Sequence, residues 1–164
     1  MMMKSSKTRA FSLVELVIVV VIIGVIAAIA VPRISRGAKG AGESAVRGSL
    51  AGLRNAIDMY SAEHNGAWPG ADGLEATLTR QLTEQTTAAG VAGTDFGPYL
   101  RKGFPPISVG PNAGKATGVI LTNVAPLAVD EAQTTKGWVY NYTTGELIAN
   151  TDDLDSNSTA FSAY

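Results

Sequence analysis

The longest hydrophobic block of the chain lies close to its N-terminus. Every residue from Leu16 to Val31 is apolar or glycine, and the wider range 11–31 contains one charged residue, Glu15. As an α-helix, 11–31 would rise roughly 31 Å, which is about the thickness of the hydrocarbon core of a bilayer. The pattern therefore predicts a single transmembrane helix.

A second apolar pattern with helical spacing follows at 46–60. Its members recur at intervals of four and three residues and so form one face of a helix: Val46, Leu50, Leu53, Ile57 and Tyr60. Gly66 is suited to end this helix. Gly37, Gly40 and Gly42 lie between the two blocks and weaken helix propensity there. We expect one long helix across both blocks, and a break at these glycines is the alternative.

The remaining elements are predicted to be short. A second helix is expected to begin at Asp72, because Asp72 and Glu75 fit a capping box in front of regularly spaced leucines. Runs of β-branched and aromatic residues predict strands at 119–122, 138–142 and 146–149, the last two joined by a tight turn. The polar segment 150–164 is expected to be loosely ordered. The expected fold class is α+β, a long N-terminal helix packed on a small antiparallel sheet.

Charge is distributed unevenly along the chain. The formal net charge is −1, from 13 Lys and Arg against 14 Asp and Glu. Lys4, Lys7 and Arg9 lie in the first ten residues without an acid, so the rest of the chain is acidic. An acidic domain is unsuited to a phosphate backbone, so nucleic acid is not an expected partner. The chain has no cysteine, which excludes disulfides, thiolate catalysis and iron–sulfur clusters.

The cations also bear on membrane orientation. Three precede the apolar block, and Arg33, Arg36 and Lys39 follow it, so the positive-inside rule is less one-sided than usual. We expect the N-terminus to stay in the cytoplasm, because a ten-residue leader is easier to retain than a domain. Three segments result: a basic leader at 1–10, a transmembrane and assembly helix at 11–31, and an extracytoplasmic globular domain at 32–164 that includes the rest of the long helix.

The stretch Lys7-Thr8-Arg9-Ala10-Phe11-Ser12-Leu13-Val14-Glu15-Leu16 opens the membrane helix. It resembles the type IV pilin superfamily, which includes the pseudopilins of type II secretion. The resemblance implies that a prepilin peptidase cuts between Ala10 and Phe11 and methylates the new amine. Ala10 stands where the family usually has glycine. Gly24 and Pro32 occupy positions where the family has helix-weakening residues and where its helices loosen inside filaments. Glycine and proline are also common in ordinary membrane helices.

Glu15 is informative independently of the resemblance. A carboxylate in the hydrocarbon layer costs roughly 2–3 kcal/mol, so it is normally paired or functional. After cleavage, the Phe11 amine of a neighbouring subunit is a suitable partner, and that pair would set the register between subunits. The alternatives are that Glu15 reaches the interface or pairs with its own N-terminus. For the whole segment, the alternative is an ordinary secretory signal cleaved after Ala28-Ile29-Ala30.

Further along, the likeness narrows to the major pseudopilin of type II secretion. It rests on Ala56-Ile57-Asp58-Met59-Tyr60, Asn65-Gly66-Ala67-Trp68-Pro69 and Gly73-Leu74. The resemblance implies a filament subunit that lies in the inner membrane before assembly and in a periplasmic or cell-surface filament afterwards. Its implied partners are copies of itself, other pilin-like subunits, the secretion machinery, the prepilin peptidase and membrane lipid.

That subfamily also carries a calcium site in its C-terminal loops. Asp152, Asp153 and Asp155 offer oxygen ligands that suit calcium. Their spacing matches no EF-hand loop, and an acidic tail is more often simply solvated. Calcium is therefore a candidate ligand, and no other cofactor is expected.

No pattern in the sequence indicates catalysis. The chain has one histidine, His64, next to a predicted helix end, and no phosphate-binding loop or nucleophile elbow. We therefore expect a structural subunit of a secretion pseudopilus and not an enzyme. The alternatives are a type IV pilus subunit for adhesion or motility, and a membrane-anchored extracytoplasmic binding domain.

Overall fold

A computed structural model describes residues 11–164, except for the side chains at 31, 32 and 34–36. The chain divides into two compact units, Met1–Lys39 and Gly40–Tyr164. Helix α1, Leu13–Glu63, contributes residues to both units. The expected long helix is therefore confirmed, and Gly37, Gly40 and Gly42 lie inside it without ending it.

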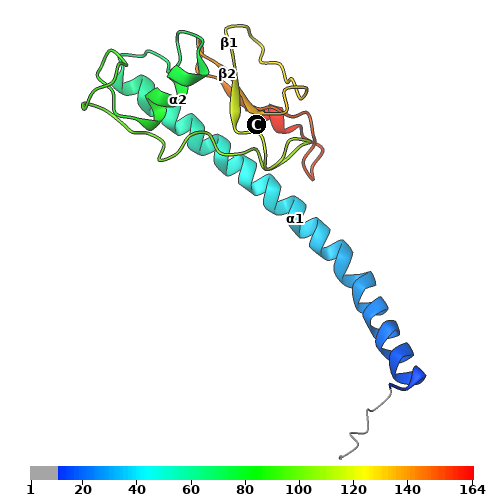
Figure 1. The fold of residues 1–164 in the computed structure, drawn as a ribbon. Coiled ribbons are helices and arrows are strands. Elements are labelled where there is room, and N and C mark those ends of the chain that lie inside the picture. The colour runs from blue at the N-terminus through cyan, green and yellow to red at the C-terminus, as the bar shows by residue number, and fades with distance from the viewer. Residues whose placement is uncertain (1–10) are drawn as a thin grey trace, which may run out of the picture. The chain divides into compact units, whose positions relative to one another are not determined.

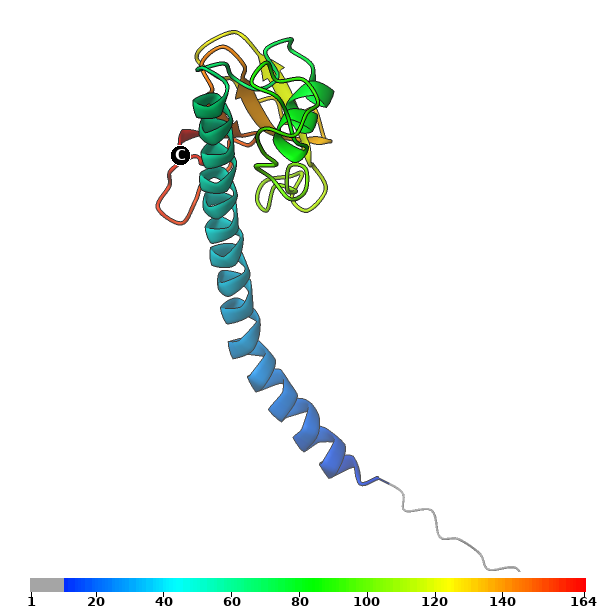
Figure 2. The same ribbon diagram turned by 90° about the vertical axis from the view of Figure 1, so that its left-hand side faces the viewer.

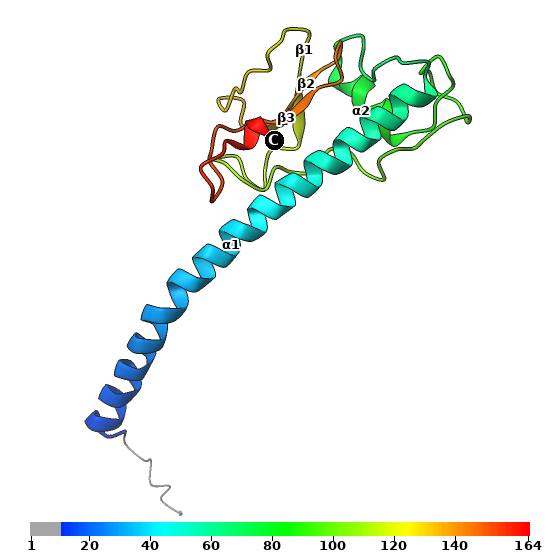
Figure 3. The ribbon, with the colours of Figure 1, turned by 180° about the vertical axis from the view of Figure 1, so that it is seen from behind.

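In the second unit, a small sheet lies beside the C-terminal part of α1 (Figure 1). Its elements after α1 are helix α2 (Glu75–Thr83), strands β1 (Gly118–Thr122), β2 (Lys136–Asn141) and β3 (Leu147–Ala149), and the 3₁₀ helix η1 (Phe161–Ala163). The strand order is β1-β2-β3, with β2 in the centre, and Figure 3 shows β3 next to β2. The α+β class expected from the sequence is confirmed.

One detail of the predicted sheet needs correction, because the sheet is mixed. β1 and β2 are parallel, with Val119 opposite Trp138, whereas β2 and β3 are antiparallel, with Val139 opposite Ile148. Parallel neighbours need a long crossover connection, and the segment 123–135 between β1 and β2 provides it. Periodicity within each strand cannot reveal this, because it does not depend on the direction of the neighbour.

The turn between β2 and β3 is built by a side chain at the end of β2. The Asn141 carboxamide oxygen accepts hydrogen bonds from the backbone N–H of Thr143 at 2.9 Å and of Thr144 at 3.3 Å. Gly145 follows with φ of 77°, and a Cβ there would come within 2.5 Å of the Trp68 ring. The turn therefore requires glycine, and the predicted hairpin is confirmed.

The core of the second unit lies between α1 and the sheet. All five residues of the predicted α1 stripe are buried, and they belong to one cluster with Trp138, Tyr140 and Leu147. The Trp138 indole N–H donates to the carbonyl oxygen of Pro105 at 2.9 Å, which satisfies the polar atom of the largest core side chain. Burial of this apolar surface is the main force that holds the C-terminal part of α1 in the unit.

The start of α2 differs from the predicted capping box. The helix begins at Glu75, and the N-cap residue is Leu74, without a side-chain cap. Asp72 lies two residues before that cap and instead accepts hydrogen bonds from the Leu74 N–H and the Thr77 hydroxyl. The Glu75 carboxylate accepts from the backbone N–H of Val119 at 2.7 Å and pairs with Lys136. Glu75 therefore ties α2 to the sheet.

The expectation of a loosely ordered C-terminal segment is wrong. Thr151, Asp155 and Phe161 are all buried. Asp155 pairs with Arg47 of α1 at 2.7 Å, and the Ser156 hydroxyl donates to Glu43 at 2.9 Å. Figure 2 shows this segment, in red, beside the part of α1 that belongs to the second unit. Polar composition misled the prediction, because these polar groups find partners on α1 and do not remain in water.

Candidate functional site

The N-terminal end of α1 is closed by two side chains. Ser12 is followed by the first helical residue, Leu13, and its hydroxyl accepts a hydrogen bond from the Val14 N–H at 3.3 Å. In return, the Glu15 carboxylate accepts from the Ser12 N–H at 2.9 Å. This reciprocal pair is a capping box, which satisfies amide groups that would otherwise lack a partner. The Ser-x-x-Glu spacing is visible in the sequence and could have been found there.

The helix that starts at this box exposes apolar side chains. Leu13–Ala30 has a mean hydropathy of 3.2, and among the described residues it is the one helix segment long and apolar enough to cross a membrane. None of that window is buried within the protein, and side chains such as Ile18 and Ile26 are more than half exposed. Glu15 is the single ionisable residue inside it. An apolar surface of this extent needs a covering by lipid or by other helices.

The other residues singled out by the sequence are placed as follows. Ala10 lies outside the described residues. Phe11 is 88% exposed and precedes the capping box. A Cβ at Gly24 would have nothing within 4 Å, so that face of α1 is open to close approach by another helix. Pro32 lies within the bounds of α1.

The three aspartates considered for calcium are not gathered into one site. Across residues 11–164, no group of three or more His, Cys, Asp or Glu side chains is placed to hold a metal ion. Asp152 and Asp153 are exposed, whereas Asp155 is buried. The Asp155 oxygens accept hydrogen bonds from the backbone N–H groups of Asn157 at 2.7 Å and Thr159 at 2.9 Å. The Asp155 carboxylate therefore acts as the anchor of a loop.

Asp155 also belongs to a cluster that links the C-terminal segment to α1. The Tyr164 hydroxyl donates to Asp155, and the Arg47 guanidinium lies 4.6 Å from the centre of the Tyr164 ring. The hydrogen bond from Tyr164, the two backbone N–H donors and the charge of Arg47 lower the pKa of Asp155 to about 2. The carboxylate is thus ionised at any physiological pH and keeps its contacts with Arg47 and Tyr164.

His64 is part of the core and not of a reactive site. Its Nδ1 donates to the Tyr60 carbonyl at 2.7 Å, and its Nε2 lies 2.9 Å from the Thr86 hydroxyl. Its ring stacks on the Tyr60 ring at a centroid distance of 3.8 Å. The side chain is 2% exposed, so it joins the end of α1 to the loop at Thr86.

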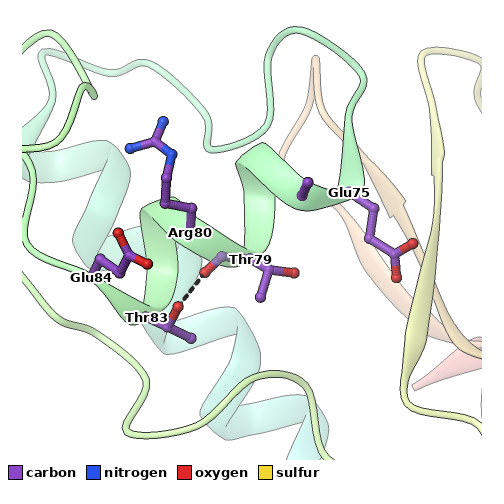
Figure 4. Close-up of a pocket in the computed structure, with 6 residues that line it drawn as sticks. Glu75, Thr79, Arg80, Thr83 and Glu84 are labelled. Carbon is purple, nitrogen blue, oxygen red and sulfur yellow. Dashed lines mark hydrogen bonds between the residues drawn. The ribbon is translucent and has the colours of Figure 1, made fainter.

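One open hollow runs along α2 and is shown in Figure 4. Its lining comes from a single helix and its C-terminal end: Glu75, Ala76, Thr79, Arg80, Thr83 and Glu84. The Thr83 hydroxyl donates to the Thr79 carbonyl at 2.7 Å, and the Glu75 carboxylate points toward β1. The Arg80 guanidinium donates to the Gly90 carbonyl at 3.3 Å. The hollow is thus lined by one helix and not by polar groups that converge from several elements, as they do where a small molecule binds.

The N-terminal segment matches a known family model. Residues 5–31 match the Prokaryotic N-terminal methylation motif. No curated protein and no solved structure matches the chain. The motif is a type IV pilin-like prepilin signal, so it supports the resemblance to the pilin superfamily and indicates a type IV pilin-like subunit. Such subunits are structural, are processed by a prepilin peptidase and assemble into filaments.

Proposed function

We propose that the chain is a structural subunit that polymerises through its N-terminal helix into a pseudopilus serving protein secretion. The observation that carries the proposal is the uncovered apolar segment Leu13–Ala30 of α1, which begins at the capping box of Ser12 and Glu15 and lies within the matched methylation motif. Before assembly, lipid covers this helix. In the filament, the same helix of other copies covers it.

The preference for a secretion pseudopilus over an adhesive or motile pilus rests on two features of the sequence. The segment that ends in Gly73-Leu74 is similar to that of the major pseudopilin, and the chain has no cysteine pair of the kind frequent in pilins. The subunit would lie in the cytoplasmic membrane with residues 32–164 on the extracytoplasmic side, and the filament in the periplasm or at the cell surface.

Processing and assembly are coupled at one end of α1. Cleavage between Ala10 and Phe11 would create a charged amine next to the capping box. The Glu15 carboxylate bonds its own backbone in the single chain, through the Ser12 N–H. In the filament, it would pair with the Phe11 amine of a neighbouring subunit, because each charge is costly without a partner in a medium of low dielectric constant. Loosening of α1 between Gly24 and Pro32 would adjust the helix to its neighbours.

The capping box determines how this pairing is tested. Glutamine at a capping-box position can still accept from the backbone N–H, but it carries no charge. Glu15→Gln therefore removes the ion pair and keeps the cap, whereas Ser12→Ala removes the serine half of the cap and keeps the charge. We expect Glu15→Gln and Glu15→Ala to insert into the membrane at normal abundance and to form few filaments. Glu15→Asp should be intermediate, because its shorter side chain reaches less far.

The measurement is filament yield beside the abundance of the subunit in the membrane fraction. Ser12→Ala is the matched control, and its filament yield should stay close to wild type. A Glu15→Gln variant that forms filaments at wild-type yield would show that the charge does not set the register. An equal loss in Ser12→Ala would assign the defect to helix capping.

A further inference from the structure

Three cations follow the apolar segment of α1 and are called the basic collar here: Arg33, Arg36 and Lys39. The side chains of Arg33 and Lys39 are exposed. The nearest acid after the collar is Glu43, four residues beyond Lys39, and its carboxylate accepts a hydrogen bond from the Ser156 hydroxyl at 2.9 Å. All three positions lie on α1 within the first compact unit.

The helix sets the depth of the collar relative to the apolar segment. At 1.5 Å per residue, Arg33 lies about 4.5 Å and Lys39 about 13.5 Å beyond Ala30 along the helix axis. The headgroup layer extends roughly 5–8 Å beyond the hydrocarbon on each side of a bilayer. Arg33 is thus at the depth of the lipid phosphates when Leu13–Ala30 spans the membrane, and the long side chain of Lys39 can reach back toward them.

Processing makes these cations the dominant basic residues at the membrane. The uncleaved chain carries Lys4, Lys7 and Arg9 before the span and the collar after it. Removal of 1–10 leaves no basic side chain before the span, and the collar remains. The mature helix would then carry its basic side chains on the extracytoplasmic side of the membrane, whereas the positive-inside rule places them on the cytoplasmic side. A local anionic partner at that surface would compensate.

We propose that the basic collar binds the phosphate groups of anionic phospholipids at the surface where α1 leaves the bilayer, and so retains the unassembled subunit in the membrane. The inference rests on the proposed function, since it requires a membrane-spanning α1. A guanidinium group can hold a phosphate through two parallel hydrogen bonds, and an ammonium group binds it as a point charge. The three-residue spacing places the collar on an arc of about 120° of the helix, so that neighbouring headgroups can be engaged together.

A second copy of the chain is the competing partner. Residues 40–164 carry thirteen acidic residues against seven basic ones, so another subunit could also offer carboxylates. Lipid is favoured because phosphates lie at the depth of Arg33, and within reach of the long side chain of Lys39, whenever the span is inserted. Carboxylates of another copy come within reach only after assembly begins.

The test uses the full chain in vesicles of phosphatidylcholine mixed with phosphatidylglycerol. Spin-labelled forms of each lipid report, by electron paramagnetic resonance, the fraction of each that is immobilised at the protein. A basic side chain near an anionic surface contributes about 1 kcal/mol, which corresponds to roughly a fivefold change in association. We expect wild type to select phosphatidylglycerol and the variant Arg33→Gln/Arg36→Gln/Lys39→Gln to lose that selectivity.

The matched control removes three exposed cations of the second unit, as Arg101→Gln/Lys102→Gln/Lys115→Gln, and should keep wild-type selectivity. Soluble glycerol phosphate should not compete, because the proposed partner is the headgroup held at the surface. Equal immobilisation of both lipids by wild type would overturn the proposal. A collar variant that still selects phosphatidylglycerol would also overturn it. If such a variant forms no filaments, the collar binds another copy of the chain and not lipid. If neither lipid is immobilised at all, no span is present and the proposed function itself fails.

Discussion

Leu53→Ala tests whether the C-terminal part of α1 is held by the core of the second unit. Leu53 is 2% exposed and belongs to the core cluster with Trp138 and Tyr140. Truncation of a buried leucine to alanine costs about 2–5 kcal/mol, because apolar burial is lost and a cavity remains. In a domain of this size, that loss lowers the midpoint of thermal unfolding by on the order of 10 °C.

The assay is thermal and urea unfolding of the fragment Gly40–Tyr164, which corresponds to the second compact unit. Leu154→Ala is the matched control, since it makes the same chemical change at a residue that is 51% exposed. Its free energy of unfolding should stay within about 0.5 kcal/mol of wild type. If Leu53→Ala and Leu154→Ala unfold alike, Leu53 is not buried and the packing of α1 described above is wrong.

Three other outcomes are expected. N-terminal mass spectrometry of the mature chain should find a methylated Phe11 as its first residue; a start at Val31 would indicate an ordinary secretory signal. Because the pKa of Asp155 is lowered to about 2, below its unfolded value of about 3.9, the stabilisation that it provides is complete above pH 4 and is lost as the pH falls toward 2. The unfolding midpoint of Asp155→Asn should therefore fall less than that of wild type over this range. The fragment should melt at the same temperature with calcium or with chelator, since Asp155 is already bound within its loop; a higher melting temperature in calcium that Asp153→Ala abolishes would restore the calcium site.

The sequence predicted the elements that depend on apolar spacing or on contacts between residues close in the chain. The stripe from Val46 to Tyr60 identified the buried face of α1, because helical spacing fixes which side chains share a face. The turn that ends at Gly145 was also predictable, since Asn141, Thr143 and Thr144, which build it, are neighbours in the sequence. The mixed sheet was not, because the parallel pairing of β1 with β2 depends on the path of a distant connection.

The candidate site was predicted unevenly. Glu15 was identified from its isolation in an apolar segment, but its bond to the Ser12 N–H was overlooked, although Ser-x-x-Glu is a local signal. Asp155 was assigned to a solvated tail or a calcium site, whereas its partner is Arg47, 108 positions away in the chain. No local pattern connects two residues at that separation, so only the folded structure could show the pair.

Because the C-terminal segment contacts α1, the domain cannot complete its fold until the end of the chain has been synthesised. Ribosomes add about 5–20 residues per second, so residues near Arg47 wait several seconds before Asp155 is made. During that interval the apolar stripe of α1 has neither the sheet nor the C-terminal segment to cover it. During this period the apolar side chains of 46–60 are uncovered, and we expect substitutions that slow the late closure to appear first as degradation of the newly made chain.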